Sequence, residues 1–257
     1  MITFGLRFDH HFWPGRSKEA ATAIGKALDH RVFGTLRRLA YSRGDRVSKH
    51  QPKTAAAVTE ILLSPECDAA ELDQGRTRVP TASMVIFTGR LTRNWPIENQ
   101  HMRSYGAIPY DPAHPLDIVE GFLSLATALE AFSGYICVES GWAAAEIAAL
   151  GMRRKPPPSD FPRRAQEREA HARYFERRET QIAGPEWGLF LGPGHLARVT
   201  PDPAVFPVIR DVGRGKLCLL SDNPEDALTA AFDVRLDAAR QALAPILMDV
   251  SEVPVDG

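Results

Sequence analysis

The sequence predicts an α+β fold in a single compact domain, with a mostly antiparallel sheet packed against amphipathic helices. At 257 residues, the chain is long enough for one large domain with a full apolar core. Helical and strand-like segments are mixed, without the regular strand–helix alternation that a doubly wound parallel sheet requires. Two strand-like runs, 205–212 and 216–221, flank a glycine turn, which favours antiparallel pairing.

The first half of the chain predicts two strands and at least one helix. Ile2 to Phe8 alternates apolar and polar residues, as in a half-buried strand. Residues 18–40 carry apolar residues at helical spacing and predict one amphipathic helix. Residues 54–63 fit a short helix or a strand, and the polar stretch 66–78 predicts a loop. The β-branched content of residues 82–91 then indicates a buried strand.

The second half contains the clearest helix of the sequence. It follows Pro115 and runs over residues 116–132, with apolar side chains along one face. Residues 134–140 then predict a buried strand, and residues 142–151 a short helix closed by a glycine. A final amphipathic helix is expected over residues 227–247, followed by an acidic tail.

Composition favours a soluble, cytoplasmic protein. With 44% hydrophobic and 25% charged residues, the chain has the average composition of folded soluble proteins. The start of the chain lacks the apolar run of a signal peptide, and no stretch approaches the roughly 20 apolar residues of a membrane helix. Three widely spaced cysteines suit buried thiols in a reducing compartment.

Charge is distributed unevenly along the chain. Residues 1–53 carry eleven Lys or Arg against four acids, whereas residues 222–257 carry two Arg against eight acids. Two interpretations follow from this asymmetry. The oppositely charged ends could neutralise each other in the fold, or the acidic end could form a face for a basic partner.

An exposed connection rich in proline and arginine is predicted at residues 153–178. It contains three consecutive prolines, nine basic residues and four acidic ones. The prolines predict an extended segment, followed by a solvated helix with paired charges. Its basic residues, together with Tyr174 and Phe175, could instead bind a nucleic acid, although its four acids weaken the positive electrostatic potential of the segment.

No motif in the chain indicates a catalytic, cofactor or metal site. Gly192 to Ala197 matches a dinucleotide fingerprint, but Pro201 and Pro203 leave room for barely one helical turn behind it. Asp9, His10 and His11 could supply metal ligands. Neighbouring residues on a strand point to opposite faces, however, so His10 and His11 cannot readily bind the same metal ion. The serines lack the glycines of a nucleophile elbow, so we expect binding and not catalysis.

From about Ile108 to Val199 the chain resembles immunity proteins of bacterial polymorphic-toxin and type VI secretion systems. The resemblance rests on a helix that leads into a Ser-Gly-Tyr strand at 133–135 and on an arginine-rich connection. It also includes a Gly-Pro-Glu-Trp run at 184–187 that closes on Gly-Pro-Gly-His-Leu at 192–196. These motifs are structural, with turn glycines and a tryptophan expected to be buried.

The resemblance implies a cytoplasmic α+β protein that neutralises a cognate toxin by tight binding, without a cofactor. Such families are paired with restriction-endonuclease-like nuclease toxins, whose DNA-binding clefts are basic. An acidic surface would then block the toxin by charge complementarity. The residues expected to form this partner-binding surface are Asp222, Glu225, Asp226, Asp249 and Glu252. Trp142 or Tyr110 could contribute more binding energy, because hot spots favour buried aromatic residues.

Two other classes of function stay open at this stage. A nucleic-acid-binding protein would lose salt-dependent binding when Arg163, Arg164 and Arg168 are replaced by alanine. An enzyme of unrecognised type would show a deep polar pocket with shifted pKa values.

Overall fold

The computed structural model describes most of the chain in separate stretches. They are residues 2–11, 18–33, 38–43, 46–50, 55–64, 67, 69–73, 83–87, 101–141, 144–145, 148–149, 167, 170 and 177–250. Trp142, Glu252, and Arg163, Arg164 and Arg168 of the predicted connection lie outside the described residues.

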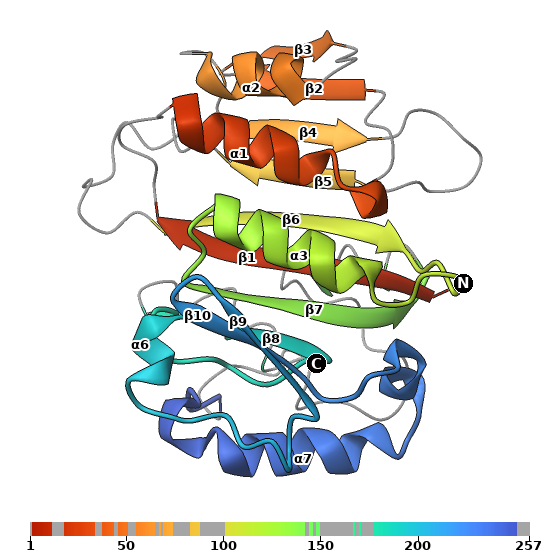
Figure 1. Cartoon of the computed structure of the whole chain (residues 1–257), viewed down its shortest axis with the longest axis vertical. Coiled ribbons are helices and arrows are strands. Elements are labelled where there is room, and N and C mark those ends of the chain that lie inside the picture. Colours follow the sequence, from red (N-terminus) through yellow and green to blue (C-terminus); the bar gives the residue numbers. More distant parts are fainter. Residues whose placement is uncertain are drawn as a thin grey trace.

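In the described stretches, ten strands form one sheet in the order β3-β2-β4-β5-β6-β1-β7-β8-β10-β9 (Figure 1). They are β1 (Ile2–His11), β2 (Arg38–Arg43), β3 (Arg46–His50), β4 (Ala69–Asp73), β5 (Ser83–Phe87), β6 (His101–Pro109), β7 (Ser133–Ser140), β8 (Gly188–Leu191), β9 (Val208–Val212) and β10 (Gly215–Leu219). Every neighbouring pair in this order is antiparallel. The predicted α+β fold with an antiparallel sheet is confirmed.

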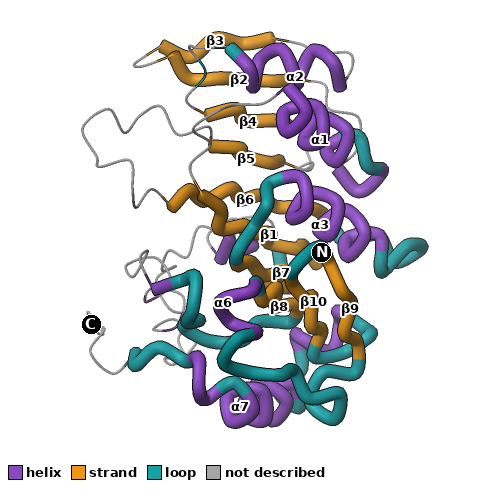
Figure 2. Tube along the Cα trace, turned by 60° about the vertical axis from the view of Figure 1, so that its left-hand side comes forward, coloured by secondary structure: helices purple, strands orange, loops and turns teal. Residues whose placement is uncertain are grey.

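Of the described elements, three helices cover one face of the sheet. They are α1 (Lys18–Leu28), α2 (Ala55–Leu63) and α3 (Asp117–Ala128), and Figure 2 shows them together on one side of the strands. The contact between α3 and the sheet is aromatic, because Phe8 of β1 stacks on Phe122 of α3 with ring centroids 4.5 Å apart. Phe190 of β8 meets the edge of the same ring. One continuous core therefore spans the strands on both sides of β1.

The C-terminal part of the chain adds further helices around β8, β9 and β10. They are α6 (Pro193–Leu196), α7 (Phe232–Ala242) and the 3-10 helices η5 (Pro224–Leu228) and η6 (Ala244–Ile246), while η1 (Arg31–Phe33) follows α1. An ion pair between Arg210 of β9 and Glu120 of α3 links the end of the sheet to the helical layer. The sheet thus curls enough to bring its last strand within side-chain reach of α3.

The predicted helix over residues 18–40 was wrong beyond Leu28. The chain makes the 3-10 turn η1, which buries Phe33, and then enters β2. Leu39 of β2 lies opposite Leu72 of β4. Tertiary strand pairing thus overrides a helical pattern that continues in the sequence.

The predicted loop over residues 66–78 was also wrong, because it contains β4. Ala70 and Leu72 are fully buried, and they alternate with the polar residues Glu71 and Asp73. This alternation is typical of a strand. The loop was predicted because most of the surrounding residues are polar or charged. Strand β6 was not predicted, although it lies beside β1 at the centre of the sheet.

The single helix predicted over residues 227–247 is divided among η5, α7 and η6, and most of the helix predicted over 142–151 lies outside the described residues. Several other predicted elements agree with the structure more closely. β5, β7 and the β9–β10 hairpin lie where strands were expected, and Ala55–Leu63 form the helix α2 in the segment that fitted a helix or a strand. α3 ends at Ala128, four residues before the predicted end, and Glu130 adopts a positive φ of 50° there. None of the helices in the described stretches is long and apolar enough to cross a membrane.

Candidate functional site

Three of the five predicted partner-binding residues, Asp222, Glu225 and Asp226, lie in or directly before the short helix η5. Asn223 precedes this helix, and its side chain accepts a hydrogen bond from the backbone N–H of Glu225 at 3.1 Å. Pro224 occupies the first turn, where its missing N–H costs nothing. The Asn-Pro pair thus fixes a tight turn from which Asp222, Glu225 and Asp226 project. This turn is a capped 3-10 helix.

These three carboxylates remain available to solvent. Asp222 and Glu225 are exposed and Asp226 is half-buried. None of them forms an ion pair with a residue in the described stretches. Asp249 is exposed too, but it follows η6, beyond the far end of the eleven-residue helix α7. A helix of that length is about 16 Å long.

Tyr110 and Asp111 extend this acidic group from a distant part of the sequence. The Tyr110 hydroxyl faces the Glu225 carboxylate, which can accept its hydrogen bond. Burial, the Glu225 carboxylate and then Asp111 raise the pKa of Tyr110. The Tyr110 ring is held by an edge-on contact with Phe4 of β1, with centroids 5.7 Å apart. Sequence reasoning named Tyr110 but had no signal for its contact with Glu225, and it missed Asp111.

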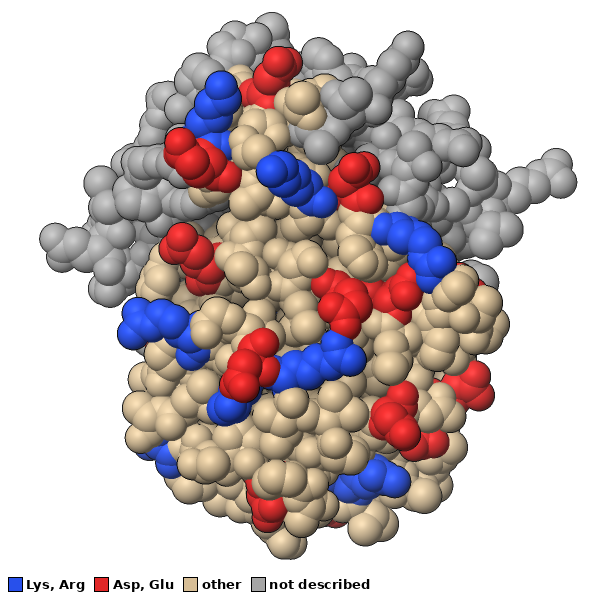
Figure 3. Space-filling view, in the orientation of Figure 1, with Lys and Arg blue, Asp and Glu red and all other residues tan. Residues whose placement is uncertain are grey.

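We call this group of residues the acidic surface. Its members are Tyr110, Asp111, Asp222, Glu225, Asp226 and Leu228. Leu228 of η5 is 44% exposed and adds an apolar side chain beside the carboxylates. Figure 3 shows acidic side chains grouped over the chain that leads into α7, whereas acidic and basic side chains alternate over the middle of that face. The combination suits contact with a positively charged protein surface.

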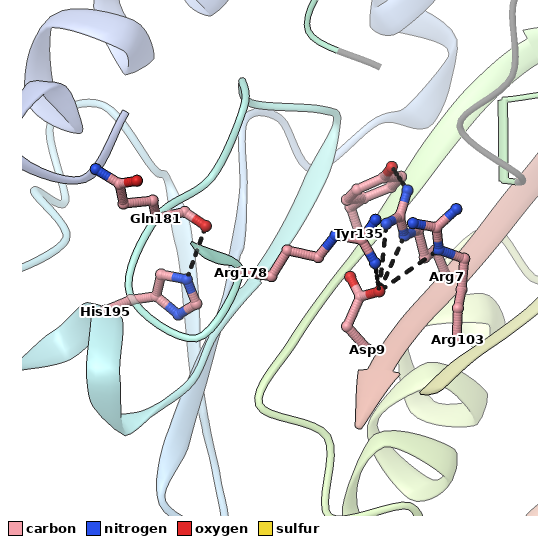
Figure 4. Close-up of polar contacts among 7 residues, drawn as sticks. All are labelled: Arg7, Asp9, Arg103, Tyr135, Arg178, Gln181 and His195. Atoms are coloured by element: carbon pink, nitrogen blue, oxygen red, sulfur yellow. Dashed lines mark hydrogen bonds and ion pairs between the residues drawn. The ribbon is translucent and has the colours of Figure 1, made fainter. Parts of the chain in front are cut away.

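A second polar group is almost entirely buried, and the strand register explains how it forms. Arg7 and Asp9 lie two residues apart on β1 and therefore share one face of the sheet. On the flanking strands, Tyr135 lies opposite Arg7 and Arg103 lies opposite Asp9. Arg178 reaches the same place from the start of the C-terminal part. We call these five residues the buried cluster (Figure 4).

Three arginines of the buried cluster converge on one oxygen of Asp9. The Oδ1 atom of Asp9 lies 2.7 Å from Arg178 Nη1, 3.2 Å from Arg7 Nη2 and 3.5 Å from Arg103 Nε. Arg7 also donates to the Tyr135 hydroxyl at 2.6 Å. The side chains of Arg7, Asp9 and Arg178 have no solvent exposure. The cluster joins three strands and the segment that precedes β8.

Burial shifts the pKa values of this cluster strongly. Desolvation is the largest cause for Arg178, whose pKa falls to about 8, and for Arg103, whose pKa falls to about 10. The neighbouring arginines lower both values further, and Asp9 opposes these shifts. Burial also raises the pKa of Tyr135. The Asp9 carboxylate is therefore the group that keeps these guanidinium ions charged inside the protein.

The pattern of the sequence did not predict the buried cluster. Alternation over Ile2 to Phe8 predicted a half-buried strand, which would leave Arg7 in water. In the structure β1 is buried on both faces from Thr3 to His10, so the prediction of a half-buried strand was wrong. The reason is that Arg7 finds an internal acceptor in Asp9. Only the i, i+2 spacing of Arg7 and Asp9 could have suggested this pairing.

The Asp9-His10-His11 sequence separates its side chains as expected for a strand. Asp9 joins the buried cluster, while His10 turns to the other face and contacts the Ser104 hydroxyl at 2.9 Å. His11 is exposed and forms an ion pair with Glu179 if protonated. Among the described residues, no three His, Cys, Asp or Glu side chains are grouped in a way that could hold a metal ion.

The glycines of the 192–197 motif serve close packing. Helix α6 has only four residues, as the prolines after it predicted. A side chain at Gly192 would place its Cβ 2.2 Å from the carbonyl oxygen of Phe132, and one at Gly194 would lie 2.2 Å from that of Glu179. Both positions therefore require glycine for backbone contact. The buried His195 contacts the carbonyl of Gln181 from this turn (Figure 4).

Another buried ion pair ties the predicted connection to α7. Arg240 binds Glu167 through two parallel hydrogen bonds of 2.7 and 2.8 Å. Glu167 and Ala170 are buried, although they fall within the segment predicted to be exposed. Most of residues 153–178 lies outside the described part of the chain.

Comparison with known proteins identifies the fold alone. No protein-family model matches the chain, and no curated protein matches it in sequence. Among solved structures, the Pseudomonas aeruginosa T6SS protein PA0821 aligns with a TM-score of 0.59 at 12% sequence identity. The alignment covers 96% of this chain and 73% of that protein. The chain therefore shares its fold with a protein of a type VI secretion system (T6SS).

Proposed function

We propose that the chain is an immunity protein associated with type VI secretion, which neutralises a cognate toxin by binding it directly. The observation that carries this proposal is the acidic surface, whose carboxylates have no cationic partner among the described residues. The fold shared with a T6SS protein supports the same assignment. The protein works by binding and not by catalysis.

The partner we propose is a nuclease toxin with a basic substrate cleft. A nucleic-acid-binding cleft carries lysines and arginines that contact phosphates. Carboxylates placed on a neighbouring protein can occupy that cleft and accelerate encounter through long-range attraction. Tyr110 and Leu228 supply an aromatic and an apolar contact within the same surface, and such contacts slow dissociation.

Co-purification tests the existence of the partner. The tagged chain is expressed with the catalytically inactivated toxin encoded by the neighbouring gene, and the affinity of the complex is measured by calorimetry. A stoichiometric complex with nanomolar affinity is expected. If none of the proteins encoded nearby binds, the immunity function is wrong.

Charge reversal tests the surface. Replacing Asp222, Glu225 and Asp226 by lysine should slow association at least about tenfold and reduce its dependence on salt. A matched control replaces three other exposed acids, Glu19, Asp29 and Glu60, by lysine.

Both triple variants change the net charge equally, but the control sites belong to α1, α2 and the turn after α1. Equal slowing in the two variants would mean that net charge alone steers the partner and would remove the acidic surface from the proposal.

The same preparations test nucleic-acid binding by residues 153–178. We expect no salt-dependent binding of DNA or RNA by the isolated protein. Binding that is lost when Arg163, Arg164 and Arg168 become alanine would favour a nucleic-acid-binding protein instead.

A further inference from the structure

The last strand of the sheet, β9, has a free edge. It pairs with β10 on one side, and no strand in the described part of the chain pairs with its other side. No backbone hydrogen bond reaches that side from any described residue. A free edge is a row of backbone donors and acceptors that a further strand can join.

The hairpin register identifies which backbone groups face outward. Gly213, with a φ of 56°, and Arg214 form a two-residue turn between Val212 and Gly215. The residues that flank such a turn are hydrogen-bonded to each other, and the pattern then alternates along the strand. Val212 and Arg210 therefore bond to β10, whereas the N–H and C=O groups of Ile209 and Asp211 point outward.

A contact on the far side of β10 agrees with this alternation. Leu220 follows β10, and its N–H donates to the carbonyl of Trp187 on the β8 side at 2.9 Å. The backbone N–H and C=O groups of even-numbered residues of β10 thus bond to β8, and those of odd-numbered residues bond to β9. Gly215, which flanks the turn, is at an odd position.

The charged side chains of β9 do not shield its edge. Charges that project over an edge normally prevent strand addition. Here Arg210 is held by Glu120 of α3, and Asp211 is held by Lys216, which lies directly opposite it on β10. Both charges are thus drawn toward neighbouring elements, and the outward backbone groups stay accessible.

The acidic surface lies at one end of this edge. Val208, at the start of β9, lies opposite Leu219, at the end of β10, and Asp222 follows three residues later. A strand placed along β9 would therefore run toward the carboxylates around η5. A segment with lysine or arginine at that end would complement them.

From this geometry we infer that β9 accepts an extended, basic segment of the partner protein as an eleventh strand. Backbone hydrogen bonds to Ile209 and Asp211 hold the segment, and the acidic surface binds its cationic side chains. The inference rests on the proposed function, because it concerns the same partner.

Proline at position 211 tests the edge. Asp211→Pro removes an outward N–H and leaves the β10 ladder intact, and proline is tolerated on an edge strand. Asp211→Ala keeps that N–H and loses the same contact with Lys216, so it is the matched control. With the inactivated toxin as partner, Asp211→Pro should bind about tenfold more weakly than Asp211→Ala.

Amide hydrogen exchange of the unaltered chain tests the same point without a substitution. The amides of Ile209 and Asp211 should exchange rapidly in the free protein and at least about tenfold more slowly in the complex. The amides of Arg210 and Val212 should be protected in both states, because they bond to β10.

Three outcomes would overturn the inference. Equal binding by the two variants, with exchange at 209 and 211 unchanged in the complex, would leave the proposed function standing and remove the eleventh strand. Concentration-dependent protection of these amides in the free protein would mean that a second copy covers the edge. If the unaltered chain binds no toxin, the proposed function fails as well.

Discussion

The buried cluster and the acidic surface use similar residue types under opposite conditions. In the cluster, one carboxylate forms ion pairs with three guanidinium groups, and most of these side chains have no contact with solvent. On the acidic surface, several carboxylates lie together without a cation from the described residues. The first arrangement pairs opposite charges within the chain, whereas the proposed function assigns the second to a partner.

This difference separates residues that hold the fold from residues available for binding. A charge removed from the interior leaves its former partners buried without compensation, which costs several kcal/mol. An exposed charge is screened by water, so its removal changes stability little. Substitutions in the two regions should therefore affect different measurements, namely unfolding in one and association in the other.

The largest expected effect is the loss of Asp9. Asp9→Ala leaves Arg7, Arg103 and Arg178 around an empty site, which should reduce the free energy of unfolding by about 3–5 kcal/mol. Urea unfolding followed by tryptophan fluorescence measures the change. Asp9→Asn keeps one acceptor and should give a smaller loss. A loss below about 1 kcal/mol for Asp9→Ala would show that the cluster does not depend on this carboxylate.

A pH-dependent loss of stability is expected from His10, on the opposite face of the same strand. Burial lowers the pKa of His10 to about 4, from an ordinary 6.5. Its neutral ring fits the site, since Nδ1 lies 3.1 Å from the His11 carbonyl and Nε2 lies 2.9 Å from the Ser104 hydroxyl.

Between pH 6.5 and 4 the unfolded chain therefore takes up a proton at His10 that the folded chain does not. Stability should fall by on the order of 3 kcal/mol as the pH falls through this window. His10→Gln should remove that part of the slope in urea unfolding at stepped pH. Equal slopes in the variant and the parent would show that other groups cause the loss.

Arg240 allows a buried and an exposed ion pair to be compared at one side chain, because it binds one buried and one exposed carboxylate. Glu167 is 6% exposed and Asp237 is 62% exposed. Glu167→Gln should lower the free energy of unfolding by about 2 kcal/mol, since it weakens a buried, doubly hydrogen-bonded pair. Asp237→Asn should lower it by about 0.5 kcal/mol or less. Similar losses in calorimetric unfolding would contradict the role that we assign to burial.

The sequence predicted those elements whose own pattern agrees with the final packing. α3 and β7 are strongly apolar and lie where their periodicity placed them. β2 and β4 were missed, because Arg38, Arg43, Glu71 and Asp73 give them a polar composition. Their strand conformation depends on pairing with each other, and a single-sequence pattern does not record such long-range contacts.

The two candidate regions differ in the same way. The sequence predicted that Asp222, Glu225 and Asp226 belong to one acidic surface, because they are close together along the chain. The contact of Tyr110 with Glu225 joins segments more than 100 residues apart, and only the fold brings them together. The buried cluster likewise needs the register of three strands. Local chemistry was therefore predictable, whereas convergence of distant residues was not.

The smallest expected effect concerns the Tyr110–Glu225 contact. Tyr110→Phe removes the donor and keeps the ring against Phe4, whereas Glu225→Gln removes the charge and keeps an acceptor. A double-mutant cycle in urea unfolding should give a coupling energy of about 0.5 kcal/mol, because the pair is near the surface.

The same cycle measured for toxin binding should give a larger coupling, since a partner would exclude water from this contact. Coupling that is large in unfolding and absent in binding would reverse the comparison. Tyr110 would then belong with the residues that hold the fold, and the acidic surface would retain only its carboxylates and Leu228.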